Sequence, residues 1–152
     1  FCGSLAAPTR WRQQTGGSVT AVDINPAAVR CATINALLND VADCVTVQQG
    51  DLFTPVSGQQ FDVVLFNPPY YRGQPQPGFD QAWRSEDVFE RFAAMLKTHL
   101  ATGGYALLVL STAGGEAACL QNLTAAQFII SVVARRDMGS EVVTIYQASL
   151  SK

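Results

Sequence analysis

The sequence predicts an α/β fold with a mainly parallel sheet and an antiparallel strand pair at its C-terminal edge. Three observations support this. Apolar, β-branched segments alternate with helix-like segments along most of the chain. The runs Phe61–Phe66 and Tyr105–Ser111 are almost continuously apolar, which is typical of strands buried on both faces of a parallel sheet. The last two segments, 127–135 and 141–150, are separated by a turn without a helix, as antiparallel strands are.

The N-terminal half begins with a strand over Ser18–Ile24 and a helix that runs to about Asn39. Asn25 can cap this helix, and Pro26 suits its first turn. We expect one face of the helix to point into the core. That face comprises Ala28, Cys31, Ala32, Asn35 and Leu38. A short strand over Cys44–Gln48 follows and is closed by Gly50-Asp51.

The remaining elements start with the strand Phe61–Phe66, which must stop at Asn67-Pro68-Pro69 because proline cannot donate to a ladder. A loop rich in Gly, Pro and Gln follows. We then expect a helix from about Ser85 to Leu100, ended by Gly103-Gly104. After this helix we expect a strand over Tyr105–Ser111, a short helix over Gly115–Leu123, and the final strand pair.

Composition indicates a single globular domain spanning residues 1–152. The chain is 48% hydrophobic and 14% charged, which excludes an intrinsically disordered protein. Its net charge of -2 argues against a domain that is held to nucleic acid by charge alone. No apolar run approaches the roughly 18 residues that a membrane-spanning helix needs, so we expect no membrane association.

The cysteines and the histidine favour no metal site. Cys2, Cys31, Cys44 and Cys119 form no C-x-x-C pair, and His99 is the one histidine, so we expect no zinc site made by this chain alone. Each cysteine has a small or apolar neighbour, as a buried structural thiol does. We therefore expect reduced thiols in a cytoplasmic protein.

Polar residues follow three predicted strands: Asp23, Asp51 and Asn67. In parallel α/β sheets, ligands bind at the carboxyl ends of the strands. A carboxylate such as Asp23 can accept hydrogen bonds from both hydroxyls of a ribose, and Ile24 offers an apolar face to a base. Asp51 can accept from an exocyclic adenine amine, with the backbone of Leu52 along the ring edge. The alternative is that both aspartates are ordinary turn or cap residues.

The sharpest signal is Asn67-Pro68-Pro69-Tyr70. Two consecutive prolines hold the backbone extended and remove two donors, which leaves carbonyl oxygens free to accept hydrogen bonds from a ligand. Asn67 adds a neutral side-chain acceptor, and Tyr70 adds a flat aromatic face. Such a site suits a planar NH2 group, because two acceptors can hold its two hydrogens. A rigid turn with a buried tyrosine is the alternative.

The segment from Val19 to Tyr70 resembles the class I S-adenosylmethionine-dependent methyltransferases, and specifically the HemK/PrmC group that methylates glutamine side chains. The resemblance rests on VTAVDINPAAV, ATINA, GDLF and FDVVLFNPPYY, and more loosely on GSEVVTIYQASL near the end. It implies a Rossmann-like fold and S-adenosyl-L-methionine as the cofactor. It also implies that Asp23 and Ile24 bind the cofactor ribose and base, and that Asp51 and Leu52 bind the adenine. Asn67 would contact the cofactor and, with Pro68, Pro69 and Tyr70, hold the acceptor amide.

The chain departs from that family at its start. The family's first strand and glycine-rich loop should precede the opening Phe1-Cys2-Gly3, and Gly16-Gly17 is better interpreted as a turn. We therefore expect the domain to be incomplete at its N-terminus, with residues upstream of Phe1 in the native protein.

The resemblance implies a glutamine in a protein as the acceptor, such as one in a peptide-chain release factor. The alternative is an exocyclic amine of adenine or guanine in RNA or DNA, for which Arg72, Arg84, Arg135 and Arg136 are the candidate basic residues. Two other classes stay open: a binding module without catalysis, and a nicotinamide-dependent oxidoreductase, in which Asn67-Pro68-Pro69-Tyr70 would have no role. A small activating subunit also stays open as a partner.

Overall fold

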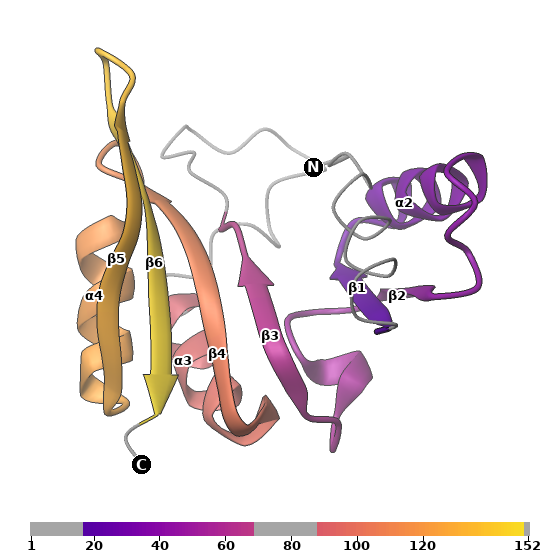
Figure 1. Ribbon diagram of the computed structural model, residues 1–152, viewed down its shortest axis with the longest axis horizontal. Helices are drawn as coiled ribbons and strands as arrows, with labels where there is room; N and C mark the ends of the chain where they lie inside the picture. The colour runs from indigo at the N-terminus through magenta and orange to yellow at the C-terminus, as the bar shows by residue number, and fades with distance from the viewer. Residues whose placement is uncertain (1–16, 69–87, 151–152) are drawn as a thin grey trace. The chain divides into compact units, whose positions relative to one another are not determined.

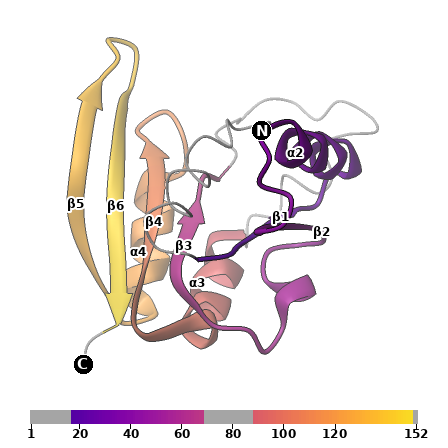
Figure 2. The ribbon, with the colours of Figure 1, turned by 45° about the vertical axis from the view of Figure 1, so that its right-hand side comes forward.

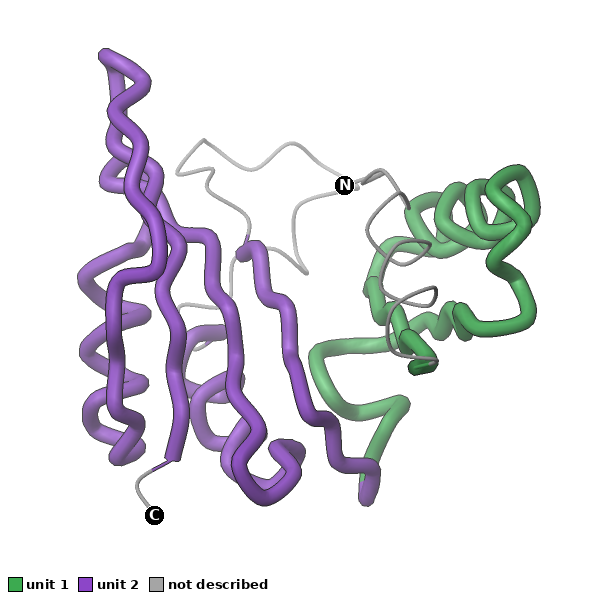
Figure 3. Tube along the Cα trace, in the orientation of Figure 1, with its two compact units in different colours: residues 1–57 green, residues 58–152 purple. Residues whose placement is uncertain are grey.

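The computed structural model describes residues 17–68 and 88–150. The chain divides into two compact units, residues 1–57 and residues 58–152 (Figure 3). The first holds β1 (Val19–Asp23), α2 (Pro26–Leu38), β2 (Val45–Gln49) and the 3-10 turn η1 (Thr54–Val56). The second holds β3 (Phe61–Phe66), α3 (Val88–His99), β4 (Leu100–Ser111), α4 (Glu116–Ala125), β5 (Phe128–Asp137) and β6 (Val142–Leu150) (Figure 1). Each unit is described by itself below.

In the first unit, β1 and β2 pair in parallel, with Val19 opposite Val45 and Asp23 opposite Gln49. Helix α2 starts as predicted. The Asn25 side chain accepts a hydrogen bond from the Ala27 amide at 2.9 Å, and Pro26 is the first helical residue. These two residues therefore fix where the chain leaves β1 and turns into the helix.

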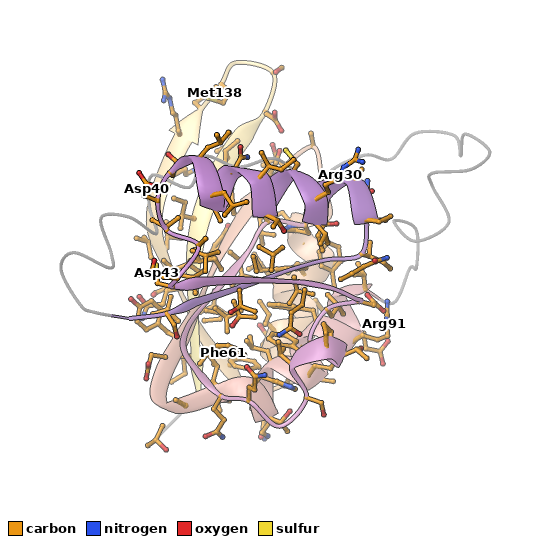
Figure 4. All side chains as sticks on the ribbon, turned by 90° about the vertical axis from the view of Figure 1, so that its right-hand side faces the viewer. Arg30, Asp40, Asp43, Phe61, Arg91 and Met138 are labelled. Carbon is orange, nitrogen blue, oxygen red and sulfur yellow. The ribbon has the colours of Figure 1, made fainter. Side chains whose placement is uncertain are left out.

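The buried face of α2 differs from the prediction. Ala36 is buried and packs with Val41 and Val45, whereas Leu38 is 75% exposed (Figure 4, which shows α2 lengthwise between Arg30 and Asp40). Ala28, Cys31, Ala32 and Asn35 are half-buried. The helix carries apolar residues all round, so its sequence pattern does not select one face.

In the second unit, the strand order is β3-β4-β6-β5. Strands β3 and β4 are parallel, and β6 pairs antiparallel with both β4 and β5. This confirms the predicted mainly parallel sheet with an antiparallel C-terminal edge. Helices α3 and α4 lie on the same face of this sheet (Figures 1 and 2). The core beneath them contains Phe92, Leu96, Leu108, Leu110 and Leu123, all almost fully buried.

Strand β3 has the predicted bounds, but it is not buried on both faces. Its Phe66 ring stacks on the Phe92 ring of α3, with centroids 3.8 Å apart. The side chain of Leu65, which points to the opposite face, is 73% exposed. The prediction of burial on both faces, which rested on the continuous run of apolar residues, is therefore wrong for this strand within its own unit.

Gly103 and Gly104 were predicted to end the preceding helix, but they lie inside β4. Helix α3 ends at His99, and β4 begins at once with Leu100. Gly103 has φ +81°, a conformation that favours glycine. A Cβ on Gly104 would lie 2.9 Å from the Phe61 carbonyl oxygen. The pair forms an irregular start to β4, where the register with β3 shifts between Phe61 and Val63.

The thiol prediction is only partly met. Cys44 and Cys119 are free thiols, whereas Cys31 is disulfide-bonded, so the expectation is wrong for that residue. Cys2 lies outside the described residues. Among the described helices, none is long and apolar enough to cross a membrane.

Candidate active site

The first group of candidate residues lies at the carboxyl ends of β1 and β2, in the first unit. Asp23 ends β1, and its backbone oxygen accepts a hydrogen bond from the Gly50 amide at 3.1 Å. This bond ties the end of β1 to the turn that carries Asp51. The structure therefore places the two predicted aspartates at the ends of two paired strands, with Asp23 as the last residue of β1 and Asp51 two residues after the end of β2.

The Asp23 carboxyl group is held in a fixed orientation. Its Oδ1 accepts a hydrogen bond from the Asn25 amide at 2.8 Å. Within the described residues, no further hydrogen bond is made by this carboxyl group, and the side chain is only half-buried. One oxygen of Asp23 thus positions the group, and the other remains an acceptor for a ligand hydroxyl.

The turn after β2 has an unusual backbone. Leu52 has φ +48°, which is uncommon for a residue other than glycine and costs of the order of 1 kcal/mol. The turn continues into η1, where the Asp51 backbone oxygen accepts from the Thr54 amide at 3.0 Å. Gly50 is packed so closely that a Cβ would lie 2.7 Å from the Pro55 ring. The turn is therefore compact and holds Asp51 and Leu52 in one conformation.

These residues fit the nucleoside end of a cofactor such as S-adenosyl-L-methionine. In this cofactor the ribose is bonded directly to the adenine. The paired strands β1 and β2 offer one carboxylate acceptor for each of them, Asp23 for the ribose hydroxyls and Asp51 for the adenine amine. Ile24, half-buried directly after Asp23, supplies apolar surface beside them. The donor and acceptor chemistry of the turn thus agrees with the ligand that the sequence predicts.

The second group of candidate residues lies at the carboxyl end of β3, in the second unit. Asn67 follows Phe66 directly and its side chain is exposed, whereas Pro68 is buried. The stacked rings of Phe66 and Phe92 anchor the end of the strand below it. Asn67 is therefore not turned into the core and can contact a ligand. Pro69 and Tyr70, the other two residues of this predicted group, lie outside the described residues.

Sequence reasoning missed a polar cluster at the end of the neighbouring strand. Phe66 of β3 pairs with Leu108 of β4, so β4 continues beyond β3 as far as Ser111. The Ser111 hydroxyl donates a hydrogen bond to the Glu141 carboxylate, and Thr112 Oγ1 accepts from the Val142 amide at 3.0 Å. The sequence did offer a signal for this cluster, because Ser111 ends an apolar strand and Thr112 follows it. The other candidate residues also lie at or just after strand ends.

A second polar pair lies beside this cluster. The Tyr146 hydroxyl on β6 donates to Oε1 of Glu116, in the first turn of α4, at 2.9 Å. Burial and the Glu116 carboxylate raise the pKa of Tyr146. The bond joins α4 to the sheet near the carboxyl end of β4.

His99 has a structural position. It is buried at the end of α3, and its ring Nδ1 lies 2.7 Å from the Met95 backbone oxygen. His99 therefore belongs to the packed C-terminus of α3.

A family model described as the methyltransferase small domain matches residues 2–134. The chain belongs to the methyltransferase small domain family. This membership confirms the predicted enzyme class, a methyltransferase, and with it S-adenosyl-L-methionine as the cofactor.

Curated relatives of this methyltransferase differ in the substrate that their names give. A protein N5-glutamine methyltransferase of Methanocaldococcus jannaschii is 32% identical, over 86% of this chain and 68% of the relative. A release factor glutamine methyltransferase of Clostridium acetobutylicum is 30% identical, over 78% of this chain and 46% of the relative. A tRNA1(Val) (adenine(37)-N6)-methyltransferase of Mannheimia succiniciproducens is 38% identical, over 45% of this chain and 29% of the relative.

The fold of the methyltransferase also matches solved structures. Precorrin-6y C5,15-methyltransferase from Geobacter metallireducens aligns with a TM-score of 0.69 at 16% identity, over 99% of this chain and 76% of that one. At this identity the likeness concerns the fold alone, and it confirms the predicted Rossmann-like class I methyltransferase architecture.

Proposed function

We propose that residues 1–152 form one catalytic domain, which transfers a methyl group to the side-chain nitrogen of a glutamine in a protein such as a peptide-chain release factor. The observation that carries this proposal is the exposed Asn67 followed by the buried Pro68 at the carboxyl end of β3, in a chain of the methyltransferase small domain family. The glutamine methyltransferases among its relatives support the same acceptor.

The acceptor chemistry follows from neutral oxygens at this turn. An amide nitrogen is a poor nucleophile because its lone pair is delocalised. The Asn67 side-chain oxygen and a backbone oxygen of the proline turn would accept hydrogen bonds from the two N–H groups of the glutamine amide. These bonds strengthen as the nitrogen gains positive charge in the transition state, so they favour transfer. The nitrogen–carbon bond forms as the methyl group leaves its donor, and one N–H proton then passes to solvent.

The cofactor side is assigned to the first unit. We propose that Asp23 holds the ribose hydroxyls, that Ile24 contacts the base, and that Asp51 with the Leu52 backbone holds the adenine edge. We also assign a contact with the cofactor to Asn67. S-adenosyl-L-methionine, when bound, supplies a methyl group on a sulfonium, which is a good leaving group. The task of these residues is therefore to orient the donor and exclude water rather than to activate it.

A second acceptor is supported by one observation. The relative that is named as a tRNA adenine N6-methyltransferase shares 38% identity over its aligned part. An exocyclic adenine amine is also a planar NH2 group, which Asn67 and the proline turn could hold in the same way. The net charge of -2 favours the protein acceptor.

The test is the fate of a labelled methyl group. The native-length protein is incubated with methyl-labelled S-adenosyl-L-methionine and, in separate reactions, a release factor, total tRNA or DNA. We expect label on one glutamine of the release factor, located by mass spectrometry. Label only in tRNA or DNA would establish the second acceptor instead, and label in none of them would refute both.

A further inference from the structure

The hairpin formed by β5 and β6 reaches past the end of the sheet where Asn67 lies. Since β6 is antiparallel to both β4 and β5, β5 runs in the same direction as β3 and β4. The hairpin turn therefore lies at the carboxyl end of the parallel strands and projects beyond β4 (Figures 1 and 2). The turn is closed by a hydrogen bond from the Met138 amide to the Glu141 oxygen at 2.9 Å.

The outer edge of β5 is exposed and carries both apolar and charged side chains. β5 is the last strand of the order β3-β4-β6-β5, and within residues 17–68 and 88–150 no strand pairs with its outer side. All residues from 131 to 140 are exposed. Val132 and Val133 are 59% and 55% exposed. We call residues 131–137 the β5 edge segment. This segment contains no proline, and its pairing with β6 is regular from Ala134 to Asp137, after a register shift between Val132 and Ala134. Its outer edge can therefore pair with another extended chain.

The β5 edge segment also carries two exposed positive charges. Arg135 pairs across the hairpin with Thr144, and Arg136 pairs with Val143, so the two side chains point to opposite faces. Neither forms an ion pair within the described residues. The two acidic residues at the end of the same hairpin accept hydrogen bonds from other groups. Asp137 accepts from the Gly139 amide at 2.8 Å, and Glu141 accepts from the Ser111 hydroxyl.

We propose that the β5 edge segment binds an extended, acidic segment of the protein substrate, which adds to the sheet as a further strand. In such a strand consecutive side chains point to opposite faces. Two consecutive acidic residues would therefore meet Arg135 and Arg136, while apolar residues nearby would cover Val132 and Val133. Backbone hydrogen bonds would supply affinity, and the two arginines would select the sequence. This proposal rests on the proposed function, because it assumes a protein as methyl acceptor.

The sheet geometry sets the distance between this segment and the methylated glutamine. The added strand would lie outside β5, so four strand spacings would separate it from β3, where Asn67 lies, which amounts to about 19 Å. An extended chain advances about 3.3 Å per residue. The acidic segment must therefore lie at least about six residues from the glutamine, so a shorter peptide around the glutamine cannot reach it.

The kinetic test compares two substrates and two double variants. The substrates are a release factor and a peptide with three residues on either side of its methylated glutamine. In R135Q/R136Q we expect KM for the release factor to rise about tenfold, equivalent to 1.4 kcal/mol, while kcat and the kinetics with the peptide stay unchanged. R30Q/K97Q, which removes two exposed positive charges elsewhere, should leave KM unchanged. Equal KM values for the two double variants would overturn the proposal.

Hydrogen exchange tests the strand addition itself. Adding the release factor should slow exchange of amides in residues 131–137, since a new strand pairs the outward N–H groups. Unchanged exchange would overturn the proposal, and so would protection by tRNA instead of the release factor. Protection that arises from raising the concentration of the protein alone would also overturn it, because a second copy would then be the partner. If the wild-type protein methylates neither the release factor nor the peptide, the proposed function itself fails.

Discussion

The binding role of Asp23 gives a prediction whose size follows from the structure. Oδ1 of this residue accepts from the Asn25 amide at 2.8 Å. The substitution Asp23→Asn keeps a carbonyl oxygen for that bond but puts an NH2 group and no charge where the second oxygen stood. One hydrogen bond to a charged acceptor is worth about 1.5–3 kcal/mol. We therefore expect S-adenosyl-L-methionine to bind about 10- to 150-fold more weakly.

The assay is titration calorimetry on the native-length protein, with Asp40→Asn as the matched control. Asp40 is exposed in the same unit and has φ +53°, a conformation that asparagine tolerates. The control should bind the cofactor like the wild type, and both variants should melt at the wild-type temperature. If Asp23→Asn also binds with wild-type affinity, the carboxyl group does not hold the ribose and the reasoning is refuted.

Three further predictions concern the acceptor turn, the core and a buried thiol. Asn67→Ala should lower kcat about 10²- to 10³-fold with only a small change in cofactor affinity, because the exposed side chain acts mainly on the acceptor amide in the transition state and does not belong to the core. Steady-state kinetics and calorimetry check this. Phe92→Ala should lower the free energy of unfolding by about 3–5 kcal/mol, since it removes a ring that is 2% exposed and stacked on Phe66. Urea titration measures this, and the control Leu37→Ala, at a 61% exposed site, should lower it by less than about 0.5 kcal/mol. Burial raises the pKa of the Cys119 thiol from 9.0 to about 12. The unfolded chain therefore loses this proton first, and wild-type stability should fall with rising pH above 9, by at most about 1.4 kcal/mol per pH unit, while Cys119→Ala should lack this component.

Local signals in the sequence predicted the parts of the fold that depend on one or two residues. Asn25 and Pro26 set the start of α2 through a side-chain cap and a fixed φ, which are properties of the residues themselves. The end of β3 at Asn67-Pro68 was predictable for the same reason. The strand-end positions of Asp23 and Asp51 followed from the alternation of strands and helices.

Features that depend on packing or long-range pairing could not be predicted in this way. On α2, Ala36 is buried and Leu38 is exposed. The sequence could not predict this, because both faces of the helix are apolar and packing against the neighbouring strands selects the buried one. In the sequence, the glycine pair in β4 has the pattern of a helix C-terminus. Its actual reason is visible only in the structure, where a Cβ on Gly104 would lie 2.9 Å from the Phe61 carbonyl oxygen. The bond from Ser111 to Glu141 joins residues 30 positions apart, and only the antiparallel register of β4 and β6 brings them together.

The central claim is that neutral oxygens at Asn67 and the proline turn hold the two hydrogens of a planar NH2 group. The most direct measurement compares a glutamine peptide with the same peptide carrying glutamate, each titrated into the protein saturated with S-adenosylhomocysteine. A carboxylate offers no hydrogen to these acceptors, so the glutamate peptide should bind at least about tenfold more weakly, and Asn67→Ala should narrow the difference. Equal or tighter binding of the glutamate peptide would contradict the account.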